Sequence, residues 1–261
     1  MPRMPVLFVG HGSPMNAVED TEFTREWARL PDHIPAPKAI LVISAHWFTR
    51  GLRVTDTAQL RMVYDMYGFP EELYHIVYPA PGAPELAHRA AALLSGTAVK
   101  IDNTWGLDHG AWTVLHRMYP QAQYPVCQLS VDGTAPAEAQ LAVGQKLADL
   151  RNEGVLILGS GNVVHNLREV GWDMAGGYPW ADEFDRYVRE HIEASDFDAV
   201  VRYAGAGNSA RRAVPSPDHF YPLLSVLGAV VPEDRVTVFN DARVMGSLSM
   251  TGYLFRDSSA D

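Results

Sequence analysis

The sequence predicts an α/β fold: a single domain with a central, largely parallel or mixed sheet that helices cover on both faces. Three short apolar runs, rich in β-branched residues and without polar alternation, are typical of strands buried on both sides: Val6–Gly10, residues 39–44 and residues 154–159. Segments with apolar residues at helical spacing lie between these runs. The 261 residues contain no internal repeat and no long linker, so we expect one domain over residues 1–261.

Weaker patterns extend the sheet and supply its helices. Further strands are expected at residues 52–55, 98–101, 126–131 and 235–239. One helix is expected between Pro84 and Gly96, a second opens at Thr134 and Pro136, and a third begins near Trp180. Their apolar stripes are Leu86, Ala90, Leu93 and Leu94; Leu141, Leu147 and Leu150; and Trp180, Phe184, Val188 and Ile192.

Composition excludes several classes of protein. With 21 Lys and Arg against 31 Asp and Glu, the net charge of −10 argues against a nucleic-acid partner or an anionic membrane surface. The single cysteine, Cys127, cannot form an internal disulfide, and no apolar run approaches the ~20 residues of a membrane helix. We therefore expect a cytoplasmic protein that is a monomer or a small homo-oligomer.

Three of the ten histidines follow the three clearest strands. His11 follows the first in Gly-His-Gly-Ser, His46 follows the second in Ser-Ala-His-Trp, and His165 comes soon after the third. Ligands of open α/β sheets bind outside the carboxyl ends of the strands, so these side chains are expected to converge there. Imidazoles gathered from distant segments predict a metal site, although any one loop histidine is equally compatible with an ordinary hydrogen-bonding role.

Two further histidines lie at candidate helix starts. His219 is expected in the first turn of a helix behind Ser216, and His109 stands between glycines at the start of another. The other five histidines are expected to be solvated or structural: His33, His75, His88, His116 and His191. Phosphate-loop, dinucleotide-fingerprint, His-Glu-x-x-His and nucleophile-elbow motifs are absent from the sequence.

With these histidines in view, the sequence resembles the class III extradiol ring-cleavage dioxygenases, and among them the 4,5-DOPA extradiol dioxygenase family. Each motif is weak by itself, but the ordered set covers nearly the whole chain. The matching segments are Gly10-His-Gly-Ser-Pro-Met15, Val42-Ile-Ser-Ala-His-Trp47, Tyr67-Gly-Phe-Pro-Glu-Glu-Leu-Tyr74, Gly106-Leu-Asp-His-Gly-Ala-Trp112, Gly159-Ser-Gly-Asn162 with His165, and Pro217-Asp-His-Phe-Tyr-Pro-Leu223.

The resemblance implies a role for each of the five histidines. His11, His46 and His219 match ligand positions for one divalent metal. His165 matches an acid/base residue, or a fourth ligand where zinc is held tetrahedrally, and His109 matches a histidine that contacts substrate. The superfamily typically binds Fe(II) through two histidines and a carboxylate, whereas three or four neutral imidazoles also suit Zn(II). The metal is therefore expected to be Zn(II) or Fe(II).

The resemblance also implies the reaction, in which a small aromatic diol and O₂ give a ring-opened product. Trp47 and Tyr67 are candidate walls of the aromatic pocket, although core packing explains each of them equally well. Two alternatives stay open. A zinc-dependent hydrolase would use His165 as the base for water, and a non-catalytic member of the fold would bind metal without turnover.

Overall fold

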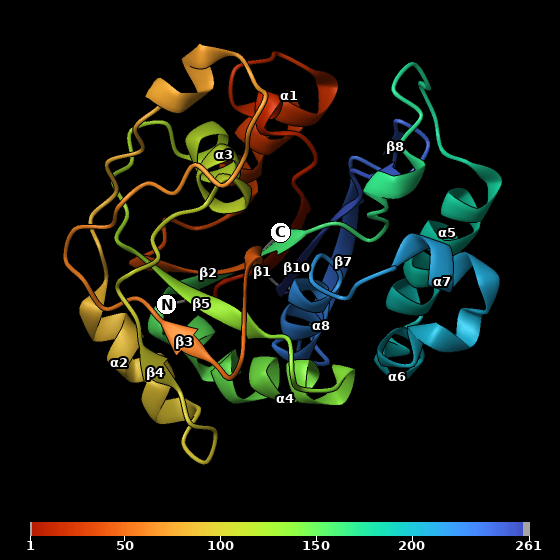
Figure 1. The fold of residues 1–261 in the computed structure, drawn as a ribbon. Coiled ribbons are helices and arrows are strands. Elements are labelled where there is room, and N and C mark those ends of the chain that lie inside the picture. Colours follow the sequence, from red (N-terminus) through yellow and green to blue (C-terminus); the bar gives the residue numbers. More distant parts are fainter. Residues whose placement is uncertain (1, 258–261) are drawn as a thin grey trace.

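An eight-stranded mixed sheet forms the centre of the computed structural model, which describes residues 2–257 (Figure 1). The strand order is β4-β3-β5-β2-β6-β1-β10-β7, and β8 pairs with β9 in a separate ribbon. The strands are β1 Val6–Gly10, β2 Ala39–Thr49, β3 Arg53–Val54, β4 Lys100–Ile101, β5 Val126–Asp132, β6 Val155–Gly161, β7 Asp234–Phe239, β8 Arg243–Val244, β9 Leu248–Ser249 and β10 Gly252–Asp257.

The middle of the sheet is parallel and its flanks are partly antiparallel. The neighbours β5, β2, β6 and β1 run parallel to one another. By contrast, β10 runs antiparallel to both β1 and β7, and β3 runs antiparallel to β5. The four parallel strands therefore end on the same edge of the sheet, which is where a ligand site of an open α/β fold lies.

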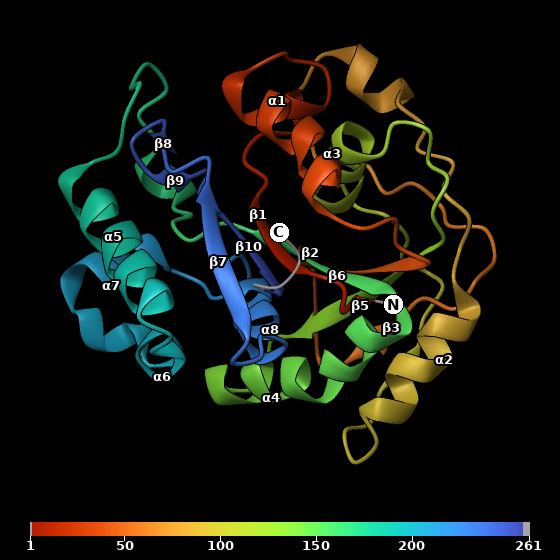
Figure 2. The same cartoon turned by 180° about the vertical axis from the view of Figure 1, so that it is seen from behind.

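Helices cover both faces of the sheet (Figures 1 and 2). On one face α2, α4, α5 and α8 pack in one apolar cluster, and on the other face α1 and α3 pack in a second cluster. The predicted single α/β domain is thus confirmed. The helices are α1 Glu22–Arg29, α2 Pro84–Leu93, α3 His109–Met118, α4 Ala137–Leu147, α5 Pro179–Glu193, α6 Phe197–Val201, α7 Asn208–Ala213 and α8 Tyr221–Gly228.

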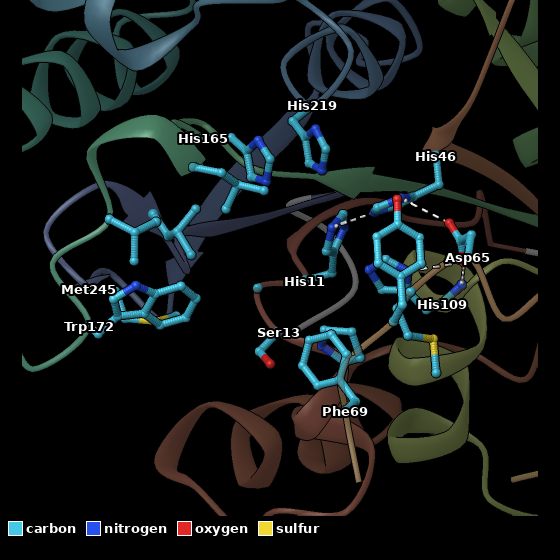
Figure 3. Close-up of a pocket in the computed structure, with 17 residues that line it drawn as sticks. His11, Ser13, His46, Asp65, Phe69, His109, His165, Trp172, His219 and Met245 are labelled. Atoms are coloured by element: carbon cyan, nitrogen blue, oxygen red, sulfur yellow. Dashed lines mark hydrogen bonds and ion pairs between the residues drawn. The ribbon is translucent and has the colours of Figure 1, made fainter. Parts of the chain in front are cut away.

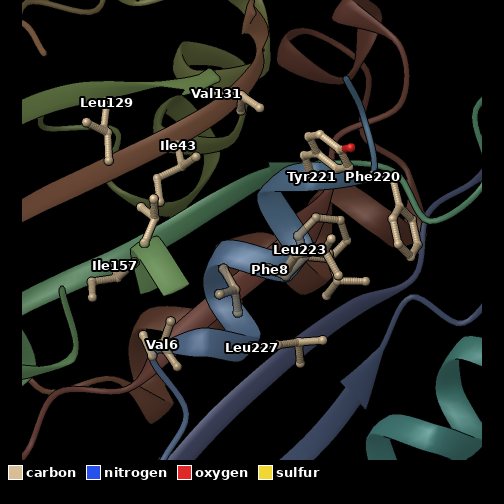
Figure 4. Packing of buried hydrophobic residues seen from close by; sticks show 14 of the residues in the cluster. Val6, Phe8, Ile43, Leu129, Val131, Ile157, Phe220, Tyr221, Leu223 and Leu227 are labelled. Atoms are coloured by element: carbon tan, nitrogen blue, oxygen red, sulfur yellow. The ribbon is translucent and has the colours of Figure 1, made fainter. Parts of the chain in front are cut away.

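Alternate residues of the central strands feed the two clusters. Val6 and Phe8 pack with α8 on one face, as Figure 4 shows, while Leu7 and Val9 pack on the other face. All four side chains are fully buried, and each such burial stabilises the fold by roughly 1.5–3 kcal/mol. This two-sided burial is the physical reason why the strand shows no polar alternation.

Three details differ from the sequence predictions. The second strand runs to Thr49 instead of ending at residue 44, and its register with β5 shifts between Ile43 and Phe48, so His46 lies within the strand. Leu150 lies in a 3₁₀ segment, Ala148–Glu153, beyond the end of α4. His219 lies in a turn ahead of α8 and not in its first turn. None of the helices among residues 2–257 is long and apolar enough to span a membrane.

Candidate active site

The five motif histidines line one cavity of about 370 Å³ at the carboxyl edge of the parallel strands (Figure 3). They arrive from separate elements. His11 follows β1, His46 lies in β2, His109 is the first residue of α3, His165 follows β6, and His219 precedes α8. The sheet topology therefore brings together histidines that are as much as 208 residues apart (219 − 11).

The histidine rings are in close contact. His46 lies 4.9 Å from His11 and 3.9 Å from His109 between ring centroids. His219 lies 5.3 Å from His11 and 5.0 Å from His46, and His165 stacks on His219 at 3.4 Å with nearly parallel rings. Potential ligand atoms fall into two groups, each within 4.8 Å: one from His11, His46 and His109, the other from His165, Asp218 and His219.

The ring of His11 is oriented by Ser160, the penultimate residue of β6. The Ser160 hydroxyl donates its only proton to the Gly110 carbonyl at 2.6 Å. Its oxygen therefore accepts a hydrogen bond from Nδ1 of His11, at 2.9 Å. This arrangement leaves Nε2 of His11 unprotonated and directed into the cavity.

Asp65 orients two histidines at once. One carboxylate oxygen accepts from Nδ1 of His46 at 3.0 Å. The other accepts from the backbone N–H of His109 at 2.9 Å and from its Nδ1 at 3.0 Å. A carboxylate behind the imidazole is the usual arrangement that fixes ring orientation and tautomer in metal-binding histidines.

His219 is held by its neighbour in the chain. Nδ1 of His219 donates to the carboxylate of Asp218, which also accepts a hydrogen bond from Ser216. Nε2 of His219 is buried and has no hydrogen-bond partner among the described residues. A buried polar nitrogen without a partner is costly, so this atom marks a place where a ligand belongs.

The Nδ1 atoms of His11, His46 and His219 are all occupied, so their Nε2 atoms remain for a ligand. Nε2 of His11 and Nε2 of His46 lie 3.1 Å apart. Two lone pairs at that distance repel unless a proton or a cation lies between them. Together with the free Nε2 of His219, this donor set fits a divalent metal held by His11, His46 and His219.

The pKa shifts follow from burial and from the two carboxylates. Burial lowers the pKa of His219 to about 4, although Asp218 opposes the shift. Burial and the neighbouring histidines hold the pKa of His11 well below its ordinary value. Burial would also lower the pKa of His46, but its hydrogen bond with Asp65 and the negative charges of nearby carboxylates together outweigh this effect and raise the pKa. Burial opposes ionisation of Asp65, yet its bonds to His109 and His46 hold its pKa below the ordinary range.

His165 differs from the other four histidines. Its backbone N–H donates to the Ala213 carbonyl at 2.9 Å, whereas no described residue forms a hydrogen bond with its ring nitrogens. Burial lowers its pKa well below the ordinary value, and the nearby His219 lowers it further. The cavity therefore contains a neutral imidazole whose nitrogens are available to a bound molecule.

Two glycines allow the histidine-bearing segments to approach one another. A Cβ atom on Gly161, at the end of β6, would lie 2.1 Å from the backbone oxygen of His219. A Cβ atom on Gly110, in the first turn of α3, would lie 2.8 Å from the ring of His46. Larger residues at either position would force these segments apart.

A buried carboxylate anchors α3 beside the site. Asp108 is fully buried, caps the helix by accepting from the Ala111 N–H at 3.1 Å, and accepts from the Ser44 hydroxyl at 2.7 Å. Gln128 also donates to Asp108. This network fixes His109, the residue that follows Asp108, relative to β2 and β5.

Of the two aromatic residues predicted to line the pocket, Tyr67 and Trp47, only Tyr67 does so. Tyr67 lines the cavity and is 90% exposed. Trp47 does not line it, since its buried side chain stacks on Trp105 at 6.2 Å. The opposite wall includes Trp172 and Met245, which the sequence did not point to (Figure 3).

Sequence reasoning also missed two residues that hold the histidines. Asp65 lies in an irregular segment with no recognisable pattern. Ser160 stands between two glycines at the end of a strand, and that position was its only signal. Both residues form hydrogen bonds to histidines that are distant in the sequence. Asp65 is 44 positions from His109, and Ser160 is 149 positions from His11.

The family model of the catalytic LigB subunit of aromatic ring-opening dioxygenases matches residues 5–255. The chain belongs to the LigB family. An Escherichia coli K12 protein named 4,5-DOPA dioxygenase extradiol is 46% identical over 253 residues, covering 95% of this chain and 93% of the relative. The Beta vulgaris protein of the same name is 39% identical over 256 residues, covering 95% of each.

A solved structure shares the fold of this chain. The crystal structure of an uncharacterized protein from Escherichia coli K12 matches with a TM-score of 0.84 and 43% identity, over 97% of this chain and 99% of the other. The predicted resemblance and the predicted aromatic ring-opening dioxygenase activity are confirmed. LigB-family dioxygenases depend on a metal, and ring opening by a dioxygenase requires an aromatic substrate and O₂.

Proposed function

We propose that this LigB-family protein cleaves the ring of a catechol at the bond beside the diol. The observation that carries this proposal is a cavity with aromatic walls that is lined by three imidazoles, each anchored through Nδ1 and each keeping Nε2 for a ligand. Because relatives of this chain are named 4,5-DOPA dioxygenase extradiol, L-DOPA is the first catechol to test.

The reaction balances without an external reductant. Both oxygen atoms of O₂ enter the product, and the carbon–carbon bond next to the diol breaks. One of its carbons becomes an aldehyde and the other a carboxylic acid. The four electrons that reduce O₂ come from the catechol itself, so no nicotinamide or flavin is needed.

His11, His46 and His219 would hold the metal. A bound divalent metal supplies Lewis acidity, which lowers the pKa of a catechol hydroxyl. Zinc is redox-inert, so Fe(II) is the metal that we assign to turnover with O₂, and Zn(II) occupation of the same imidazoles would give an inactive protein.

His165 and His109 act on the substrate in this proposal. The neutral ring of His165 accepts a proton from the catechol and returns it to the opening ring, because its nitrogens have no partner in the described chain. The ring of His109, with Nδ1 held by Asp65, donates or accepts a hydrogen bond at the substrate oxygen through Nε2.

Anaerobic reconstitution tests the proposal. Protein loaded with Fe(II) should consume one O₂ per L-DOPA and form a ring-opened chromophore, while protein loaded with Zn(II) should not. His165→Gln should keep its metal and lose turnover by a factor of about 100 or more, in the range of acid–base catalysis. Absence of O₂ uptake across a catechol panel would refute the proposal, and hydrolysis without O₂ would support the zinc hydrolase instead.

A further inference from the structure

Exposed apolar side chains gather at the mouth of the active-site cavity. Seven large hydrophobic residues are exposed in the described part of the chain. Three of them line this one cavity: Tyr67 is 90% exposed, Trp172 is 79% exposed and Leu167 is 63% exposed. Exposed apolar surface collected around a cavity is typical of a ligand-binding rim.

The same cavity has no cationic wall. Within residues 2–257, its ionisable lining residues are the five histidines, Asp65 and Tyr67, and no lysine or arginine lines it. The carboxylate of Asp65 already accepts from His46 and His109. A carboxylate on the ring substituent of a bound molecule would therefore meet no lysine or arginine in this lining, and enclosing it there would cost free energy.

The nearest basic residues along the chain do not supply this partner. Arg212 forms an ion pair with Glu169 and lies over the Trp180 ring at 4.6 Å. Arg168 follows Leu167 in sequence, but it is exposed and does not line the cavity. The net charge of −10 on the protein also weakens the binding of acidic ligands through electrostatic repulsion.

The wall that carries Trp172 is held in place by backbone hydrogen bonds. The Gly171 N–H donates to the Met245 carbonyl at 2.9 Å, and the Met245 N–H donates to the Met174 carbonyl at 2.9 Å. Trp172 and Met245 consequently lie together on one side of the cavity, across from Asp65 and His109 (Figure 3). An indole fixed opposite the histidine cluster can contact whatever substituent projects from a ring bound there.

We propose that Trp172 is a specificity-determining residue and that the site recognises the ring substituent of a catechol through apolar contact, so that a charged head group such as that of L-DOPA stays outside the rim. This inference rests on the proposed catechol chemistry. The diol lies at the histidines, the substituent packs along Trp172 and Leu167, and a charged head group on a longer substituent remains in solvent outside the rim. Affinity then comes from apolar contact with the substituent and not from an ion pair.

Binding to Fe(II)-loaded protein without O₂ tests this inference separately from turnover. By calorimetry, 4-propylcatechol should bind roughly tenfold more tightly than catechol, because about half of the alkyl surface leaves water. Trp172→Ala should remove that preference and change catechol affinity less than about twofold, whereas Trp172→Phe should retain most of it, since a smaller aromatic ring still covers the substituent. Equal weakening of both ligands in Trp172→Ala would overturn the assignment.

A charged ligand of the same length completes the test. The carboxylate 3-(3,4-dihydroxyphenyl)propionate should bind more weakly than 4-propylcatechol, and Arg168→Gln should leave both affinities unchanged. Tighter binding of the carboxylate, or its selective weakening in Arg168→Gln, would show that a cation recognises the substituent. If 4-propylcatechol binds more tightly than catechol but no catechol consumes O₂, the proposed reaction is wrong and the role of Trp172 in binding is retained. If catechols are turned over but 4-propylcatechol has no binding advantage, the role of Trp172 is wrong and the proposed reaction is retained.

Discussion

At the scale of single residues, the three histidines proposed as metal ligands are each held by a different partner. Ser160 holds His11, Asp65 holds His46, and Asp218 holds His219. In every case the partner occupies Nδ1, so Nε2 is left with a lone pair for a ligand. The proposed metal site therefore depends on three residues outside its assigned ligand set.

Asp65→Asn tests this dependence. An amide accepts through one oxygen only and cannot support both His46 and His109, so we expect metal affinity to fall by about 10- to 100-fold with the fold retained. Competition with a chromophoric chelator measures the affinity. Asp32→Asn, at an exposed position, is the matched control and should leave affinity unchanged.

A second residue-scale prediction concerns Asp185. Burial raises its pKa to about 6, although Ser249, Thr251 and Arg243 stabilise the carboxylate; Asp241 also raises it. The folded protein therefore binds this proton more readily than the unfolded chain, in which the pKa is about 3.9. Stability from this group is present below pH 4 and is lost as the pH rises through 6.

Asp185→Asn, which mimics the protonated form, should gain stability relative to wild type as the pH rises from 4 to 7. The gain should approach roughly 3 kcal/mol, the equivalent of about two pKa units. Urea denaturation of both proteins across this range measures it. A difference between them that does not vary with pH would refute the raised pKa.

At the scale of elements, the site depends on how closely strand ends and turns approach. The end of β6 touches the turn before α8 at Gly161, where the backbone of Asn162 donates to the His219 carbonyl at 2.9 Å. The long strand β2 carries His46 past the register shift to the same edge of the sheet. The approach at Gly161 is between backbones, so side-chain size at that position decides whether it forms.

Gly161→Ala should separate the end of β6 from the turn that carries His219. The added Cβ atom would lie 2.1 Å from the His219 oxygen, so we expect a loss of roughly 1–3 kcal/mol in unfolding free energy and weaker metal binding. Gly205→Ala is the control, because its Cβ atom would meet no atom within 4 Å. Equal stability of the two variants in urea would contradict the close-approach explanation.

At the scale of the whole molecule, a buried arginine joins distant segments of the chain. Arg151 is fully buried and donates to the Met4 carbonyl at 2.7 Å and to the Ala229 carbonyl at 2.7 Å. It also forms a two-pronged ion pair with Asp234, the first residue of β7. One side chain thus ties the segment before β1 to the segment that leads into the edge strand.

Arg151→Ala should destabilise the protein by about 3–5 kcal/mol, because the buried Asp234 carboxylate loses its two-pronged partner and keeps only the longer ion pair with Arg3 at 3.6 Å and the Val231 N–H. Arg89→Ala removes a similarly two-pronged but exposed pair with Glu153 and should change stability little. Urea midpoints of both variants provide the comparison. A small effect at Arg151 would mean that water or a neighbouring residue solvates Asp234.

Local sequence determined the fold class and the five histidines. Buried strands are recognisable in the sequence as continuous apolar runs, because both of their faces contact apolar layers. The residues that follow such strands lie at one edge of a parallel sheet. His11 and His165 follow their strands as predicted. His46 lies at the same edge of the sheet, although its strand, β2, runs to Thr49 and so extends beyond the predicted end at residue 44. The resemblance added His109 and His219, and all five line the cavity.

The tertiary structure alone decided which partners surround those histidines. Asp65, Trp172 and Met245 reach the cavity from irregular segments, whose paths depend on long-range packing and leave no periodic signal. Trp47 is adjacent to a site histidine in sequence but points away, since successive side chains of a strand face opposite sides of the sheet. Sequence therefore specified the imidazoles at the strand ends, whereas the folded chain specified their tautomers and the apolar wall opposite them.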